Sequence, residues 1–143
     1  MSDDSRKALR AKGLQIRTKV LGKKYVEAAL NNRNDFNGGL QALLNEYCWG
    51  AGWGGTALTL KERSLLNLGM LTALGRTHEV AVHVRGAKNN GLTNEQIAGA
   101  FLQAAIYCGV PAAVDSFRAA NPVIADMDAE NAAKPKAAKK ARK

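Results

Sequence analysis

The chain has 143 residues and a formal net charge of +9 at pH 7. This length suits one compact domain and is too short for two comfortable ones. A strongly basic balance is typical of proteins that bind nucleic acid, but here the charge lies at the two ends. Residues 1–24 have eight Lys or Arg against two acidic residues, and residues 129–143 have six against one. The body between them is nearly neutral, so we do not expect nucleic acid to be its partner.

No apolar stretch approaches the roughly 20 residues that cross a bilayer, and no charged leader with an apolar run opens the chain. We therefore expect a cytoplasmic protein without a membrane partner. Cys48 and Cys108 match no zinc-ligand spacing and form no Cys-x-x-Cys pair. Each stands beside an aromatic residue in an apolar context, which favours a buried, inert thiol. We expect no metal site.

Apolar residues recur at helical spacing between breaks marked by Gly, Pro and Asn, and β alternation is nearly absent. The pattern predicts an all-α fold of about six helices. A first helix is predicted over residues 3–21, a short element around 25–29 and another helix over about 36–48. Four glycines within residues 49–55 then predict a break. This loop holds both Trp49 and Trp53, which suit either packing anchors or the wall or lid of a site.

Two capping boxes mark later helices. A Thr-x-x-Glu box opens a helix over 59–75, and a Thr-x-x-Gln box opens one over 93–109. Apolar residues surround nearly the whole circumference of the first of these, which predicts burial from several directions and is compatible with a homo-oligomer. Pro111 suits the start of a last helix, and Pro122 is expected to kink or stop it.

The end of the chain has a different composition. Residues 132–143 contain Ala, Lys, Pro and Arg and no large apolar residue, so burial cannot compensate for the entropy of ordering them. We expect one helical domain over 1–128 and a disordered basic tail over 129–143. A non-enzymatic alternative is a binding protein that uses this tail. It predicts salt-sensitive DNA binding that deletion after Met127 abolishes.

Ionisable residues are concentrated between the two capped helices, in the segment 76–91. We predict one helix here, with Thr77 as its N-cap and Gly91 at its end. At about 100° per residue, four side chains share one face of this helix. They are Arg76, Glu79, His83 and Asn90. Arg85 lies about 200° from His83 and would reach this cluster only from elsewhere in an assembly.

Four segments are recognisable together: LKERSL at 60–65, ALGR at 73–76, HVRGAKNNG at 83–91 and AIYCGVPAA at 105–113. With the stretch Cys48-Trp49-Gly50, they resemble the carboxymuconolactone decarboxylase family, which is alkylhydroperoxidase D-like. The similarity covers about residues 10–125. It implies a compact helical fold and symmetric homo-oligomers, commonly a hexamer or trimer of dimers.

The peroxidase branch of that family requires a Glu followed by Cys-x-x-Cys-x-x-x-His. Alignment on His83 places Arg76 and Glu79 where the two cysteines would stand, and Ser64 at the position of the Glu. A thiol peroxidase needs an accessible thiolate with a resolving partner. We therefore expect the resemblance to extend to the fold of the peroxidases and not to their chemistry.

The resemblance implies a carboxy-lyase that converts 4-carboxymuconolactone to the 4-oxoadipate enol lactone, in the protocatechuate branch of the β-ketoadipate pathway. The substrate is a dicarboxylate lactone whose conjugated carbonyl accepts the electrons left by CO2, so no cofactor is required. A related enzyme, a decarboxylase or isomerase-like protein acting on another aromatic-derived carboxylate, is the alternative. The departures around residues 50–55 make it plausible.

His83 suits the proton donor because its ordinary pKa of about 6.5 lets it change charge near neutral pH. Glu79, one turn earlier, would orient the imidazole and favour its protonated form. The candidate substrate-binding residues are Arg76, Arg63, Arg85, Asn90 and Trp49. Simpler interpretations stay open: Glu79 and His83 as an ordinary surface pair, Arg76 as part of a helix connection, and Asn90 as part of a helix end.

Overall fold

The computed structural model describes residues 2–133, and within this range the chain forms seven α-helices and one π-helical segment, with no strand. The expectation of an all-α fold is confirmed for these residues. The elements are α1 (Asp3–Leu21), α2 (Lys23–Asn31), α3 (Gly38–Leu43), η1 (Leu44–Trp53), α4 (Leu60–Ala73), α5 (Thr77–Asn89), α6 (Asn94–Cys108) and α7 (Val110–Ala133). None of these helices is long and apolar enough to cross a membrane.

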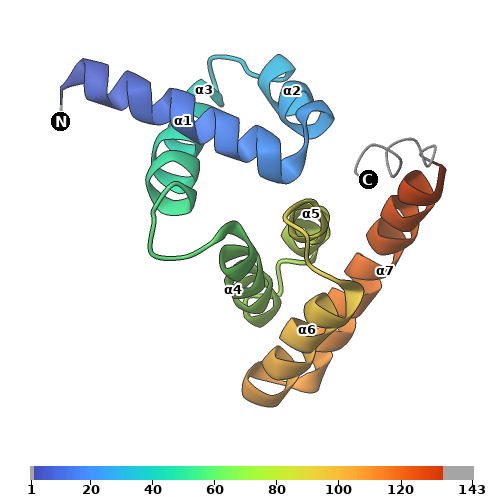
Figure 1. Cartoon of the computed structure of the whole chain (residues 1–143). Helices are drawn as coiled ribbons and strands as arrows, with labels where there is room; N and C mark the ends of the chain where they lie inside the picture. The colour runs from blue at the N-terminus through green and yellow to red at the C-terminus, as the bar shows by residue number, and fades with distance from the viewer. Residues whose placement is uncertain (1, 134–143) are drawn as a thin grey trace, which may run out of the picture.

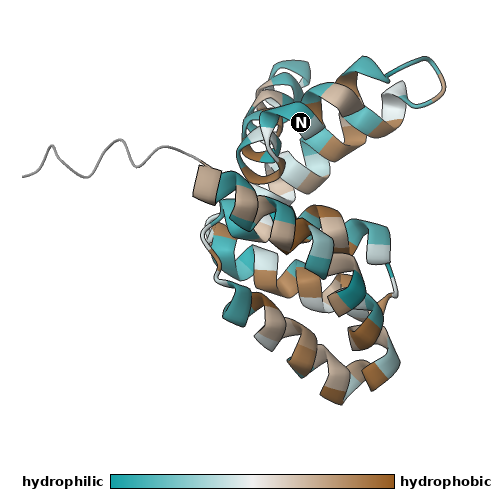
Figure 2. Ribbon diagram, turned by 90° about the vertical axis from the view of Figure 1, so that its right-hand side faces the viewer, coloured by the Kyte–Doolittle hydropathy of each residue, from teal (hydrophilic) through white to brown (hydrophobic). Residues whose placement is uncertain are grey.

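The helices form two groups with α5 between them (Figure 1). The N-terminal group consists of α1, α2, α3 and η1, and the C-terminal group of α4, α6 and α7; the rotated view separates the same groups (Figure 2). Each has its own buried apolar cluster. On α5, Val80 and Val84 are buried in the C-terminal cluster, whereas Val82 packs against the N-terminal one. Helix α5 therefore presents His83, next to Val82, towards the junction of the two groups.

Close backbone contacts hold α1 against η1. A Cβ atom on Gly13 would overlap the carbonyl oxygen of Asn45, and one on Gly50 would lie 2.5 Å from the carbonyl oxygen of Leu9. Glycine is needed at both positions because any side chain would push the two helices apart. This approach brings the residue one turn after Gly13, Arg17, up against η1.

An ion-pair cluster reinforces the same contact. The carboxylate of Glu46 on η1 is only 1% exposed, and it accepts hydrogen bonds from Arg6 Nε at 2.8 Å and Arg10 Nε at 2.7 Å. These bonds lower the pKa of Glu46, against the opposing effect of burial. Two arginines from successive turns of α1 therefore fix the position of η1.

The predicted break at residues 49–55 is wrong in its first half, because η1 continues through Trp53. Local propensity disfavours helix at these glycines, but the tight contact of Gly50 with α1 and the burial of both tryptophans favour it. Tertiary packing outweighs propensity here. The wider π-helical turn changes which side chains face the pocket.

Helix starts follow the capping signals in two cases out of three. Thr59 and Thr93 form complete capping boxes with Glu62 and Gln96, as expected. Helix α5 instead has Arg76 at the N-cap position, with no side-chain cap bond, and Thr77 is its first residue. The expectation that Thr77 is the N-cap is wrong by one residue.

The last helix extends further than expected. Helix α7 continues past Pro122 and past the predicted domain boundary at residue 128, ending at Ala133. Two ion pairs to α5 hold this part of the helix: Lys88 with Asp128 at 2.9 Å, and Arg85 with Glu130 at 3.3 Å. These long-range contacts explain why residues 129–133 are helical. The rest of the expected tail, 134–143, lies outside the described residues.

Two expectations about burial are not met within this chain. Cys48 and Cys108 are both exposed rather than buried. Helix α4 is not covered on all sides within this chain, since Leu66, Met70 and Leu74 are each about half exposed or more. The composition around these positions predicted that other apolar residues would cover them. It could not show whether those residues come from the same chain.

Candidate active site

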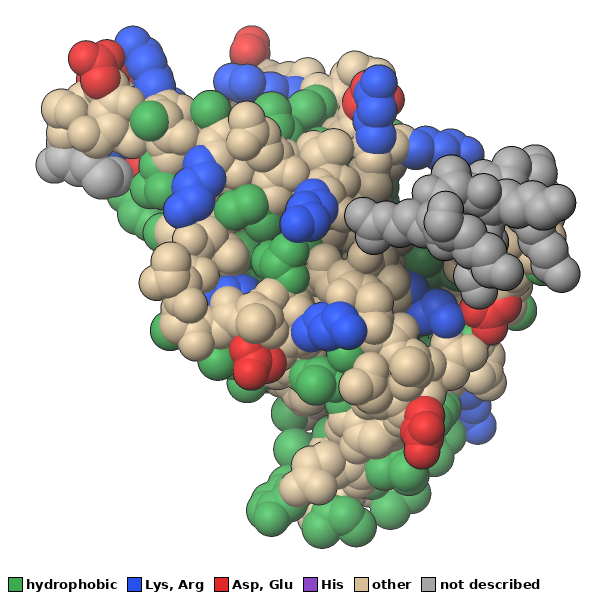
Figure 3. Space-filling model, in the orientation of Figure 1, with side chains coloured by type: hydrophobic (Ala, Val, Ile, Leu, Met, Phe, Trp, Pro, Cys, Tyr) green, Lys and Arg blue, Asp and Glu red, His purple; other side chains and the backbone are tan. Residues whose placement is uncertain are grey.

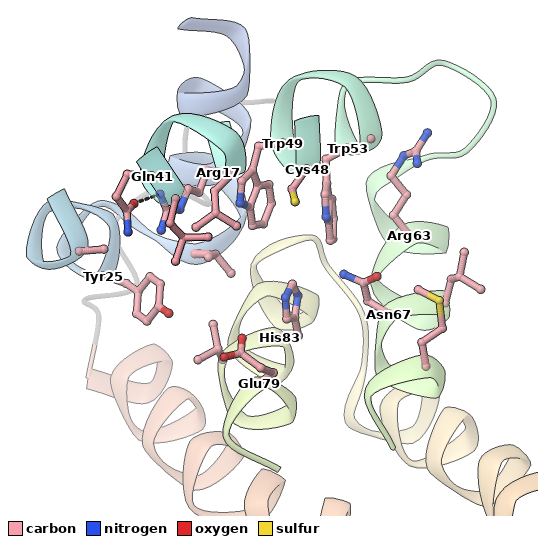
Figure 4. Close-up of a pocket in the computed structure, with 18 residues that line it drawn as sticks. Arg17, Tyr25, Gln41, Cys48, Trp49, Trp53, Arg63, Asn67, Glu79 and His83 are labelled. Carbon is pink, nitrogen blue, oxygen red and sulfur yellow. Dashed lines mark hydrogen bonds between the residues drawn. The ribbon is translucent and has the colours of Figure 1, made fainter. Parts of the chain in front are cut away.

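A pocket of about 700 Å³ lies at the junction of the two helix groups (Figure 4). This volume is typical of small-molecule sites. Helices α1 and α2 form one wall, α3 and η1 a second, and α4 and α5 the remainder. The polar and aromatic residues that line it are Arg17, Tyr25, Gln41, Cys48, Trp49, Trp53, Arg63, Asn67, Glu79 and His83.

His83 lies between the two arginines of the pocket, beneath a pair of tryptophans (Figure 4). The indoles of Trp49 and Trp53 stack with ring centroids 4.9 Å apart. Both are nearly parallel to the imidazole, at centroid distances of 6.3 and 6.0 Å. These tryptophans are buried and also line the pocket, so they serve as packing anchors and as pocket wall together.

Within the described residues, the imidazole of His83 lacks a hydrogen-bond partner for one of its two nitrogen atoms. Its Nδ1 atom is buried and has no hydrogen-bond partner within residues 2–133. Burial lowers the pKa of His83 below its ordinary value of 6.5, and the carboxylate of Glu79 opposes this with a smaller, raising effect. The free site therefore favours a neutral imidazole at neutral pH.

Glu79 has a more limited role than expected. It lines the pocket, but it is exposed and makes no hydrogen bond to His83. The expectation that it orients the ring is not met within this chain, because the Nδ1 atom lacks any partner. Its effect on His83 is electrostatic, and burial outweighs it.

Two arginines lie on opposite sides of the pocket, with Arg17 on one side and Arg63 on the other (Figure 4). Arg17 Nη1 donates to Gln41 and Asn45, and Arg63 Nη2 donates to the carbonyl oxygen of Gly55 at 3.1 Å. The Nε atoms of both are buried without a partner. Residues 2–133 contain four buried, unpartnered side-chain atoms, and three of them belong to residues that line this pocket: Arg17 Nε, Arg63 Nε and His83 Nδ1.

Three predicted site residues lie outside this pocket. Arg76 is exposed at the start of α5, and Arg85 pairs with Glu130 on α7. Asn90 donates to the carbonyl oxygen of Leu60 and to the Ser64 hydroxyl on α4. Arg76 and Asn90 share a rotational face with His83, but each is seven residues away, which is about 10 Å along the helix axis. Rotation alone could not reveal this separation.

Arg17 was missed, although the sequence contains a signal for it. On α1 it shares a face with Gly13, Val20 and Leu21, all of which are buried. A cation on the apolar face of an amphipathic helix is rare unless it is paired or functional. Tyr25 and Asn67 were missed as well, because their approach to the pocket depends on tertiary packing between helices.

Comparison with known proteins finds similar sequences. The sequence model of the Carboxymuconolactone decarboxylase family matches residues 38–122. A nitrosuccinic acid decarboxylase from Metarhizium robertsii is 39% identical over 126 residues, covering 88% of each chain. A 4-carboxymuconolactone decarboxylase from Acinetobacter baylyi is 37% identical over 115 residues, covering 80% of this chain and 86% of that protein.

The chain belongs to the carboxymuconolactone decarboxylase family. Both of these relatives are decarboxylases, and they act on different substrates. The match over 126 of the 143 residues necessarily includes part of the segment before residue 38. The similarity therefore extends beyond the family model into the N-terminal helices that form one wall of the pocket.

Proposed function

We propose that this protein is a cofactor-independent decarboxylase whose substrate is a succinate with an electron-accepting group on the carbon that loses CO2. The observation that supports this most directly is the set of three buried, unpartnered groups around one pocket: two guanidinium Nε atoms and an imidazole nitrogen. Such groups are costly unless a ligand satisfies them. A dicarboxylate would satisfy them.

The substrates named for the two relatives share this chemistry. In 4-carboxymuconolactone, one ring carbon bears a carboxylate and a carboxymethyl arm, and the conjugated lactone carbonyl accepts electrons. In nitrosuccinate, one carbon bears a carboxylate, a carboxymethyl arm and a nitro group. Both are substituted succinates with an internal electron sink, which explains how related sites can decarboxylate either one.

The reaction requires the pocket to stabilise the electron pair that CO2 leaves behind and to deliver one proton. The bond from the ring carbon to the departing carboxylate breaks. Its electrons pass through the double bond to the carbonyl oxygen of the lactone, which gives a dienolate. Arg63 can stabilise the oxygen that gains negative charge. The imidazolium of His83 then gives its proton to the α carbon, which yields the enol lactone.

Substrate charge supports this use of His83. Burial favours the neutral imidazole in the free protein, but a bound dianion favours the protonated ring because opposite charges attract. The tryptophan pair stacks over the ring. We infer that substrate binding itself charges the proton donor.

The lead substrate is 4-carboxymuconolactone, and its assay measures CO2 and enol lactone formed by the purified protein. We expect release well above the uncatalysed background, and a rate equal to background would exclude this substrate. Nitrosuccinate is the second candidate, because the relative named for it is 39% identical over most of both chains. The same CO2 assay with nitrosuccinate, followed by detection of 3-nitropropanoate, distinguishes the two. Background rates with both would contradict the proposed reaction.

A further inference from the structure

Arg17 has a feature that sets it apart from the other cations of the chain. It is only 4% exposed, and it makes no ion pair within residues 2–133. Its hydrogen bonds go to the neutral side-chain oxygens of Gln41 at 2.9 Å and Asn45 at 3.3 Å. Its Nε atom is buried without any partner, and the residue lines the pocket.

A buried guanidinium with only neutral acceptors is energetically expensive. Burial lowers the pKa of Arg17; Tyr25 and Cys48 oppose this with smaller, raising effects, and no carboxylate of residues 2–133 contributes. By contrast, the chain supplies an acidic partner elsewhere: Glu46 on η1 forms ion pairs with both Arg6 and Arg10, which lie on the same helix as Arg17. The positive charge at Arg17 is therefore left uncompensated beside the cavity, where an anion can neutralise it.

Decarboxylation gives the two carboxylates of the substrate different requirements. The departing carboxylate loses its charge in the transition state, so a strong cation bound to it would stabilise the substrate more than the transition state. The other carboxylate keeps its charge throughout. A rigid, desolvated arginine is therefore suited to the carboxylate that remains in the product, because that contact is equally strong in the substrate and in the transition state for CO2 loss.

We propose that Arg17 binds the carboxylate of the carboxymethyl arm and thereby makes the N-terminal helices a determinant of substrate specificity. This inference rests on the proposed function. Arg17 lies outside the residues 38–122 that match the family model. Arg63 lies on the opposite side of the pocket (Figure 4). We assign it to the acceptor group, where negative charge develops, so the two arginines bind different parts of the substrate.

A kinetic test changes the arm of the substrate and Arg17 together. Each substrate is compared with its analogue in which the arm carboxylate is a neutral amide. We expect the wild type to favour the acid over the amide by about tenfold to a hundredfold in kcat/KM. Arg17→Gln should abolish this preference, and Arg17→Lys should restore part of it. The matched control, Arg63→Gln, should slow both substrates and keep the ratio. An unchanged ratio in Arg17→Gln would overturn the proposal.

A binding test works without turnover. The chain has two tryptophans, and both line the pocket, so their fluorescence reports occupancy. The probes are 3-nitropropanoate, which has only the retained carboxylate, and neutral 3-nitropropanamide. The wild type and Arg63→Gln should bind the acid about tenfold or more tightly than the amide, and Arg17→Gln should bind the two equally. If the wild type shows this preference but decarboxylates neither substrate, the anion site stands and the proposed reaction fails.

A stability measurement separates a binding role from a structural one. Removal of an uncompensated buried charge should leave the protein equally or more stable, so Arg17→Met should keep or raise Tm in the absence of ligand. The same concentration of 3-nitropropanoate should raise the Tm of the wild type more than that of Arg17→Met. A large fall in Tm on this substitution would indicate that Gln41 and Asn45 suffice as partners, and would contradict the proposal.

Discussion

At the scale of single residues, His83 is a pocket residue with an unsatisfied hydrogen-bonding atom. Its ring lies against two indoles, and its Nδ1 atom has no partner within the described chain. We predict that His83→Ala lowers kcat at least about a hundredfold, the usual contribution of a general acid, without loss of helical structure. CO2 release and circular dichroism measure the two effects.

The matched control for this prediction is His78→Ala. His78 is the other histidine of the chain, and it is exposed near the start of the same helix. Its replacement should leave turnover unchanged. Wild-type turnover in a folded His83→Ala variant would remove the imidazole from the mechanism.

A pH dependence follows from the burial of His83. Burial holds its pKa below 6.5 in the free protein, so the fraction of imidazolium falls as pH rises through that lowered value. If imidazolium is the active form, kcat/KM should decrease with rising pH, with a midpoint below 6.5. A profile that is flat from pH 5 to 8 would contradict this assignment.

Glu79 provides a second variant for the same pH profile. Its carboxylate raises the pKa of His83, so Glu79→Gln should move the midpoint of kcat/KM to lower pH. At a fixed neutral pH the variant should be slower, and it should recover as the solution is acidified. Equal losses at every pH would instead indicate that Glu79 acts by direct contact with the substrate.

At the scale of the helices, the crossing of α1 over η1 determines the shape of the pocket. We predict that Gly13→Ala destabilises the fold by about 1–3 kcal/mol, because its Cβ would overlap the backbone of Asn45. Urea unfolding followed by tryptophan fluorescence measures this change. The control is Gly39→Ala, which meets nothing within 4 Å and should be neutral or slightly stabilising. Equal stability of the two variants would contradict the importance of this contact.

The helix boundaries also show which features the local sequence predicts and which it does not. The first helix has the predicted bounds, 3–21, and both capping boxes form, because these features depend on neighbours within one turn. The extension of η1 to Trp53 and of α7 to Ala133 depends on contacts with α1 and α5, far away in sequence. Local patterns contain no information about such partners.

At the scale of the whole molecule, apolar surface remains uncovered. A groove of about 620 Å³ between α4 and α6 is lined mainly by apolar residues. Beside it, Leu74, Ile106 and Tyr107 are 69–81% exposed. Figure 3 shows hydrophobic side chains gathered at the end of the molecule where α6 meets α7, and in Figure 2 the ribbon of the lower helices contains many residues of hydrophobic type. Patches of this kind mark interaction surfaces.

We propose that a second copy of the chain covers this surface, in agreement with the expectation of a homo-oligomer. Sedimentation of the wild type at micromolar concentration should reveal an assembly, and Ile106→Lys should shift it to smaller species, since a buried charge disfavours association. The control is Phe36→Lys, since Phe36 is 98% exposed in the loop after α2, away from the groove. A monomeric wild type would contradict the proposal.

The sequence by itself determined the helical class and the family, because periodicity, capping motifs and recognisable segments depend on residues close together in the sequence. It also predicted His83, Trp49 and Arg63 as site residues, and all three line the pocket. Only the tertiary structure excluded Arg76 and Asn90 from the pocket and introduced Arg17 from another helix. The physical reason is that a helical wheel gives rotation about one axis, whereas a pocket is defined by axial position and by the packing of several helices.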